Sequence, residues 1–262
     1  ANGGAMFVWE AGETGFRRVQ FRASNAEGMF LAEEAFATGP DSGEQTDPSL
    51  AVLRNGTVAL AWTDYLMDGD VKGLAGRIVT ETGDALTEPF RLNKFTKGNQ
   101  YGAQMLAMPN GGIAAVWVSD QQQSKKSIDI VARLFNSVGQ PLTGEVIVSQ
   151  PGISANPVLG VAGDRLMVAW EQVDLDNKKT RWNIQMRSFD LNLKPMTEAL
   201  TANQKQEGDQ FAPSLQGSTE GAMLAWNSLG QDGSREAVMG RFLNREGLFE
   251  GEEFVVNSTK FA

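Results

Sequence analysis

Residues 58–62, Val58-Ala59-Leu60-Ala61-Trp62, recur in slightly altered form along the chain. Four further segments repeat this mixture of small and large apolar residues ending in tryptophan: 5–9, 113–117, 166–170 and 222–226. The five tryptophans, which stand 53, 55, 53 and 56 residues apart, are Trp9, Trp62, Trp117, Trp170 and Trp226. A period of this size indicates a repeat architecture.

An arginine and a turn position recur once per repeat, as the tryptophans do. Each unit carries an arginine followed six residues later by a turn residue: Arg22 with Gly28, Arg77 with Gly83, Arg133 with Gly139, Arg187 with Leu193, and Arg241 with Gly247. We expect these arginines to pair with carboxylates or cap carbonyls between units, because the guanidinium offers several fixed donors. Anion binding in a central channel is the alternative.

The pattern within each unit predicts strands only. In residues 58–62 both faces are apolar, which suits a strand buried between neighbouring sheets. Turn residues recur about every ten positions, and helical periodicity is missing. Four short strands repeated five times predict a single all-β domain over residues 1–262, a β-propeller of five four-stranded blades with the first blade incomplete. The repeat units are approximately 1–47, 48–102, 103–156, 157–212 and 213–262.

Composition narrows the chemistry. The chain of 262 residues has no cysteine and no histidine, which excludes disulfides, thiolate and histidine catalysis, and the commonest zinc ligands. The net charge is -9 and the sequence has no basic cluster, so we expect no nucleic-acid partner. No apolar run is long enough to span a bilayer, so we expect no direct membrane insertion.

Variable loops suggest where a ligand or partner binds. The spacing from the tryptophan to the arginine varies from 13 to 17 residues, in the loop from the second to the third strand, and loops of this kind often carry binding residues. Oxygen-bearing side chains dominate these loops, and the candidate binding residues are Asp64, Tyr65, Asp68, Asp70, Asp174, Asp176 and Asp232. Asp64, Asp68 and Asp70 form a possible calcium site, although Asp-Gly is first of all a tight-turn signal.

The tryptophans have two interpretations. The five periodic ones end doubly apolar strands and are expected in the core between blades, although a ring of sugar-stacking platforms is the alternative. Trp182 lies out of phase, after Lys178-Lys179-Thr180-Arg181, and is the candidate for an exposed stacking residue.

The fifth unit resembles a repeat found in large secreted and surface proteins of bacteria. Residues 226–234, 240–247 and 253–257 are similar to its W-x-S-x-x-Q-D-G-S, G-x-x-x-R-F-D-x-x-G and F-x-V-N segments, and residues 208–213 match its G-D-Q-x-x-P linker. The match weakens in the other units, where Leu193 replaces the turn glycine. The resemblance implies an exported, propeller-like module associated with cell surfaces or adhesion, and it brings no catalytic residues.

Three functions are compatible with these features. We expect a non-catalytic binding or assembly module, extracytoplasmic in location, that holds a protein partner through the loop rim. The first alternative is a lectin that binds a glycan, and the second is a propeller-fold glycosidase, which needs paired carboxylates but no histidine. Its candidate acids are Glu10, Asp64, Asp120, Glu171 and Asp174, and the S-x-D-x-G-x-x-W boxes of propeller sialidases do not occur.

Overall fold

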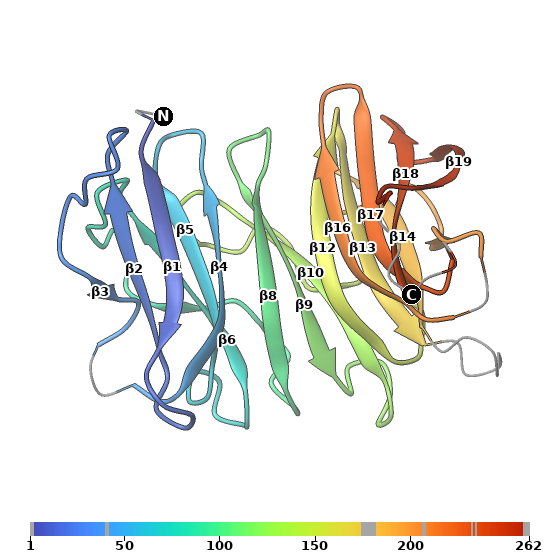
Figure 1. The fold of residues 1–262 in the computed structure, drawn as a ribbon. Coiled ribbons are helices and arrows are strands. Elements are labelled where there is room, and N and C mark those ends of the chain that lie inside the picture. Colours follow the sequence, from blue (N-terminus) through green and yellow to red (C-terminus); the bar gives the residue numbers. More distant parts are fainter. Residues whose placement is uncertain are drawn as a thin grey trace. The chain divides into compact units, whose positions relative to one another are not determined.

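The fold is described from a computed structural model, which places residues 3–39, 42–173, 182–205, 208–231, 233 and 235–258. Among these residues there is no helix, and hence none that could cross a membrane. The strands form five sheets in which neighbours in the sequence are neighbours in space (Figure 1). This confirms the prediction of an all-β propeller with five blades, the first of which has three strands.

The sheets contain 19 strands in simple sequential order. The first sheet comprises β1 (Ala5–Ala11), β2 (Arg18–Ser24) and β3 (Ala35–Phe36); the second comprises β4 (Gln45–Val52), β5 (Val58–Asp64), β6 (Gly73–Val79) and β7 (Phe90–Arg91); the third comprises β8 (Gln100–Ala107), β9 (Ile113–Asp120), β10 (Ile128–Phe135) and β11 (Val146–Ile147). The fourth comprises β12 (Ser154–Ala162), β13 (Arg165–Val173), β14 (Trp182–Asp190) and β15 (Leu200–Thr201), and the fifth comprises β16 (Gln210–Gly217), β17 (Gly221–Leu229), β18 (Glu236–Asn244) and β19 (Phe249–Val255).

The chain divides into two compact units. Unit 1 comprises residues 1–122 and 132–145, and unit 2 comprises residues 123–131 and 146–262. Each unit has its own apolar core. In unit 1 the cluster contains Val19, Phe21, Ala37, Val58, Leu60, Trp62, Ala75 and Val79. In unit 2 the cluster contains Met167, Ile184, Met186, Leu215, Leu224, Trp226, Met239 and Leu243, with buried alanines between them. The single closed domain expected from the repeat stays a prediction.

Four of the periodic tryptophans lie on the second strand of a four-stranded sheet, and Trp9 lies on β1, the first strand of the three-stranded sheet. Trp62, Trp117 and Trp170 have no exposed surface, and Trp226 is 1% exposed. Every residue of β5 is buried, which agrees with the expectation that both faces of this segment are covered. Trp9 is only partly buried because β1 has a neighbouring strand on one side only in its sheet.

The recurrent arginines join strands and sheets through backbone carbonyls. In each blade the arginine Nε donates to a carbonyl just before or within the last strand of its sheet: Arg22 to Ala32, Arg77 to Thr87, Arg133 to Thr143, Arg187 to Thr197, and Arg241 to Gly251. In four blades Nη1 also donates to a carbonyl of the preceding sheet: Arg77 to Ala37, Arg133 to Leu92, Arg187 to Val148, and Arg241 to Ala202. These contacts match the structural role that we expected.

A bulge recurs near the start of each first strand. The pairing with the second strand shifts register at Thr46/Ser49, and equivalent shifts occur in β8, β12 and β16. The bulged residue has a positive φ in all four sheets: Asp47 (53°), Gly102 (66°), Asn156 (48°) and Ala212 (53°). Aspartate, asparagine and glycine tolerate this left-handed conformation best, which explains three of the four residue types.

Candidate functional site

One rim of unit 1 carries the polar side chains that are suited to binding a ligand or to catalysis. In the second sheet Gln45 at the start of β4 pairs with Asp64 at the end of β5, and Asp64 pairs with Gly73 at the start of β6. The linkers between blades and the loops from second to third strand therefore leave the sheets at the same end. This is the rim that loop variation indicated.

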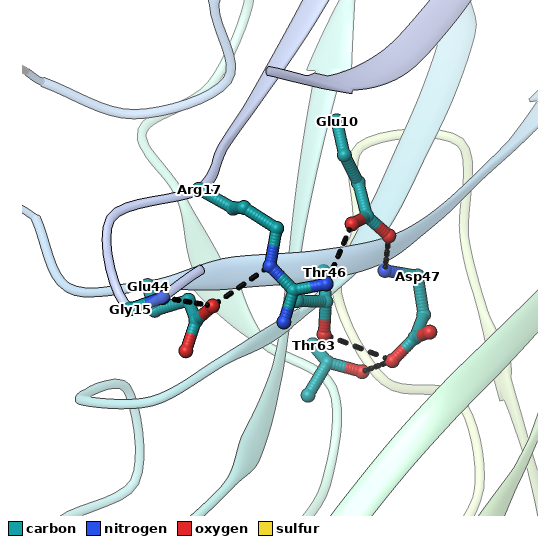
Figure 2. Close-up of polar contacts among 7 residues, drawn as sticks. All are labelled: Glu10, Gly15, Arg17, Glu44, Thr46, Asp47 and Thr63. Carbon is teal, nitrogen blue, oxygen red and sulfur yellow. Dashed lines mark hydrogen bonds and ion pairs between the residues drawn. The ribbon is translucent and has the colours of Figure 1, made fainter. Parts of the chain in front are cut away.

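An ion-pair chain occupies the first part of this rim. Arg17 Nε donates to Glu44 Oε1 at 2.8 Å, and Arg17 Nη1 donates to Glu10 Oε2 at 3.1 Å (Figure 2). The Gly15 amide also donates to Glu44 Oε1, at 2.9 Å. This amide, together with the Arg17 guanidinium, holds the pKa of the Glu44 carboxyl below its ordinary value. The charge of Arg17 is thus committed to two protein carboxylates.

Asp47 extends from the bulge of β4 beside this chain. Its backbone amide donates to Glu10 Oε1 at 2.8 Å, and its Oδ2 accepts hydrogen bonds from the hydroxyls of Thr46 and Thr63, at 2.9 and 3.0 Å (Figure 2). The residue is exposed, and no described residue donates to Oδ1. Fixed contacts on one oxygen therefore orient the carboxylate and leave the other oxygen free for a ligand.

Lys72 lies beside both tyrosines of the protein. Its Nζ is 4.9 Å from the centre of the Tyr65 ring and 5.8 Å from that of Tyr101, and the chain contains no further tyrosine. The Lys72 carbonyl accepts from the Gln100 amide at 2.8 Å, which anchors the lysine next to β8. All three side chains are half-buried, and among the described residues none accepts a hydrogen bond or ion pair from the ammonium.

Asp120 approaches Tyr101 from the end of β9. Its Oδ2 accepts a hydrogen bond from Asn99 Nδ2 at 2.8 Å, and its backbone amide donates to the Asn99 carbonyl. Burial raises the pKa of the Tyr101 phenol above its ordinary value, and the charges of Asp120 and Asp47 raise it further. Tyr101 is therefore a neutral hydrogen-bond donor near two carboxylates, Asp47 and Asp120.

In three of the five blades the residue after the tryptophan makes the same contact with the bulge of a first strand. Glu10 accepts the amide of Asp47, Thr63 accepts that of Gly102 at 3.1 Å, and Glu171 accepts that of Ala212 at 2.7 Å. Glu171 is only 5% exposed and also accepts Asn156 Nδ2 at 2.8 Å. Glu10 and Glu171, which the sequence offered as candidate acids, thus hold the bulge of a neighbouring first strand.

Asp64 is buried and hydrogen-bonded within the protein. It is 3% exposed, and its Oδ2 accepts from Trp62 Nε1 and Gln45 Nε2, both at 3.1 Å. Its Oδ1 accepts the Leu66 amide at 2.9 Å. The side chain is therefore fully occupied by contacts within the protein, whereas Tyr65, the next residue, faces Lys72.

The other loop candidates are distributed over several places. Asp68 accepts from Asn93 Nδ2 at 2.8 Å, and Asp70 accepts the Gly98 amide at 2.9 Å. Among the described residues no group of three or more acidic side chains is arranged to hold a metal ion, so calcium at Asp64, Asp68 and Asp70 stays a prediction. Trp182 is half-buried at the start of β14. Asp174, Asp176 and Asp232 lie outside the described residues.

Sequence reasoning missed Arg17, Glu44, Asp47, Lys72 and Tyr101. A signal for Asp47 was present, because Asp47, Gly102 and Asn156 occupy the same repeat position and all tolerate a positive φ. Tyr101 also carried a signal, since it is one of two tyrosines in the chain. The ion pairs of Arg17 had none, because they depend on the path of the linker before β4.

A pocket of about 320 Å³ lies at the opposite rim of unit 1. Its lining is mainly apolar and includes Met6, Leu31 and Val52, with Arg54 and Glu81 as its charged residues. It contains no pair of carboxylates. The rim with Asp47, Asp120 and Lys72 is therefore the better candidate for chemistry, and we call these three residues together with Tyr65 and Tyr101 the rim cluster.

Comparison with known proteins supports the fold. No family model and no curated protein matches the chain. Among solved structures it is similar to an ulvan lyase of family PL25, with a TM-score of 0.63, 10% identity and coverage of 99% of this chain and 70% of the other. It is also similar to an α-L-arabinofuranosidase from Lactobacillus brevis (0.55, 13%, 97% and 92%) and to an α-L-arabinanase from Penicillium chrysogenum in complex with arabinobiose (0.60, 14%, 82% and 67%).

These matches correct one expectation. The chain was predicted to be a non-catalytic binding or assembly module, and this was wrong, because the propellers that it resembles are glycoside hydrolases and a polysaccharide lyase. The expectation that it is not an enzyme is corrected on the same ground. At 10–14% identity the likeness establishes the fold alone, so the activity has to follow from the residues of this chain.

Proposed function

We propose that the protein is an extracytoplasmic carbohydrate-active hydrolase that cleaves glycosidic bonds at the rim cluster. The supporting observation is that two carboxylates of the same rim, Asp47 and Asp120, are each held through Oδ2 by hydrogen bonds, and that both are near enough to Tyr101 to raise the pKa of its phenol. Glycoside hydrolysis needs two carboxyl groups, one that protonates the leaving oxygen and one that acts as base or nucleophile. It needs neither histidine nor cysteine, which this chain lacks.

In this proposal each group has a task that its hydrogen bonds support. Asp47 is oriented through Oδ2 by two hydroxyls and presents Oδ1, and Asp120 is oriented through Oδ2 by Asn99. Both carboxylates therefore approach a bound sugar in defined orientations, which lowers the entropy that the reaction must lose. Tyr101 donates a hydrogen bond to the sugar or to the leaving oxygen. Because its pKa is raised, it is poorly suited to be the base of an elimination.

The test is a cleavage assay with matched variants. The protein is incubated with a panel of plant and algal polysaccharides, and new reducing ends and unsaturated sugars are measured separately. We expect reducing ends without unsaturated products. Asp47→Asn and Asp120→Asn should each lower the rate by about 10²–10⁴-fold, the usual contribution of a general acid or base.

Asp84→Asn is the control for this assay. Asp84 also accepts hydrogen bonds from two threonine hydroxyls, those of Thr80 and Thr82, but it lies in the turn after β6 at the opposite rim. It should leave the rate unchanged. Unsaturated products would indicate that the reaction is elimination and not hydrolysis. Saturable glycan binding without any cleavage would favour a lectin. Full activity of Asp47→Asn would contradict the proposed site.

A further inference from the structure

Hydrogen-bond donors without protein acceptors gather in one part of the rim cluster. The Lys72 ammonium has three N–H donors, and Tyr65 and Tyr101 have one hydroxyl each. Among the described residues none of these groups donates a hydrogen bond to the protein. Both rings lie within 5.8 Å of the ammonium, so the lysine is sheltered on two sides by aromatic surface.

Arg17 and Lys72, two cations of this rim, differ in the partners that they contact. Arg17 is saturated by Glu10 and Glu44, with contacts of 3.1 and 2.8 Å. Lys72 is close enough to lower the pKa of Glu44 through its charge, yet it forms no ion pair with a described residue. A half-buried ammonium that has lost part of its hydration and has no carboxylate partner is a favourable place for an anionic group.

Resting on the proposed function, we infer that the sugar bound beside Lys72 carries a carboxylate, so that the substrate is a glycan containing uronic acid. The carboxylate accepts from the Lys72 ammonium, and the tyrosines contact the sugar ring with their faces or hydroxyls. The free carboxylate oxygens of Asp47 and Asp120 then face the neutral part of the same substrate.

The experiment measures binding rather than cleavage. Oligomers of galacturonate, glucuronate and mannuronate are titrated by calorimetry, each next to its methyl-esterified form, which has the same sugar and no charge. The protein carries Asp47→Asn throughout, so that no ligand is consumed. We expect at least one acidic oligomer to bind about tenfold or more tightly than its ester, and the difference to shrink as salt rises.

Lys72→Met and Lys125→Met separate the site from overall charge. Both variants remove one positive charge, but Lys125 is exposed in the loop before β10 and its side chain forms no hydrogen bond or ion pair with a described residue. Lys72→Met should abolish the preference for the acid over the ester, whereas Lys125→Met should preserve the preference.

Three results would overturn the inference: equal affinity for acids and esters in all three pairs, a preference that persists in Lys72→Met, or loss of the preference in Lys125→Met. Acid-selective binding that depends on Lys72 in a protein that cleaves no glycan would keep the inference and refute the proposed hydrolysis. The failures of the two proposals are therefore distinguishable.

Discussion

Replacing Arg77 with methionine tests the links between blades. The Arg77 Nε donates to the Thr87 carbonyl at 2.9 Å, and Nη1 donates to the Ala37 carbonyl of the preceding sheet at 3.0 Å. A hydrogen bond to a charged group contributes about 1.5–3 kcal/mol. Because the guanidinium is only half-buried and water can replace part of these contacts, we take the lower end for each and expect a loss of about 3 kcal/mol. For a chain of this size the melting temperature should fall by about 6–12 °C.

Arg22→Met and Arg54→Met provide the scale for this measurement. Arg22 occupies the same repeat position and donates to the Ala32 carbonyl at 2.8 Å, but among the described residues it donates to no second sheet. It should lose about half as much stability as Arg77, about 1.5 kcal/mol. Arg54 is exposed and should lose almost nothing. Urea denaturation and thermal melts of the three variants decide the matter. If Arg22→Met is as damaging as Arg77→Met, the bond to the preceding sheet contributes no stability and the reasoning fails.

Two further predictions concern buried polar groups and pH. Trp62→Phe should destabilise the protein by about 1–3 kcal/mol more than Trp117→Phe. The reason is that Trp62 Nε1 donates to the buried Asp64, whereas Trp117 Nε1 is buried without a hydrogen-bond partner among the described residues. The reverse order of stability in urea denaturation would contradict this. The pKa of Glu44 is lower in the folded state than its ordinary value of 4.5, so its stabilising effect is present above that value and disappears as the pH falls through the folded pKa. Glu44→Gln should therefore flatten the fall in melting temperature at acid pH, and an unchanged profile would rule out this role.

Much of the fold could be predicted because its repeat consists of residue types that have few structural alternatives. Tryptophan at the end of a doubly apolar segment has to be covered on both sides, and Trp62 and Trp170 are fully buried. The arginine six residues before a turn reaches carbonyls at a constant distance along the chain, as Arg133 and Arg187 both do. The division into two compact units had no signal of this kind, because the repeat continues unchanged across residues 123–145.

The candidate site was harder to predict because it depends on contacts between different blades. Asp64 looked like a ligand in the sequence, yet its position two residues after Trp62 places it under the indole nitrogen, where it is buried. Lys72 gave no signal by itself, since a lysine before a strand is normally exposed. Only the approach of Tyr65 from the same loop and Tyr101 from the next blade makes it notable.

The repeat itself explains how such a site can arise. In three blades the residue after the tryptophan, Glu10, Thr63 or Glu171, accepts the amide of a bulged residue in the neighbouring first strand. This backbone contact does not depend on the side chain of the bulged residue, which is aspartate at 47, glycine at 102 and alanine at 212. The fold therefore fixes the direction of that position and leaves its chemistry free. A carboxylate introduced there, as at Asp47, is aimed at the rim from the outset, and its Thr46 and Thr63 contacts need no rearrangement of the strand.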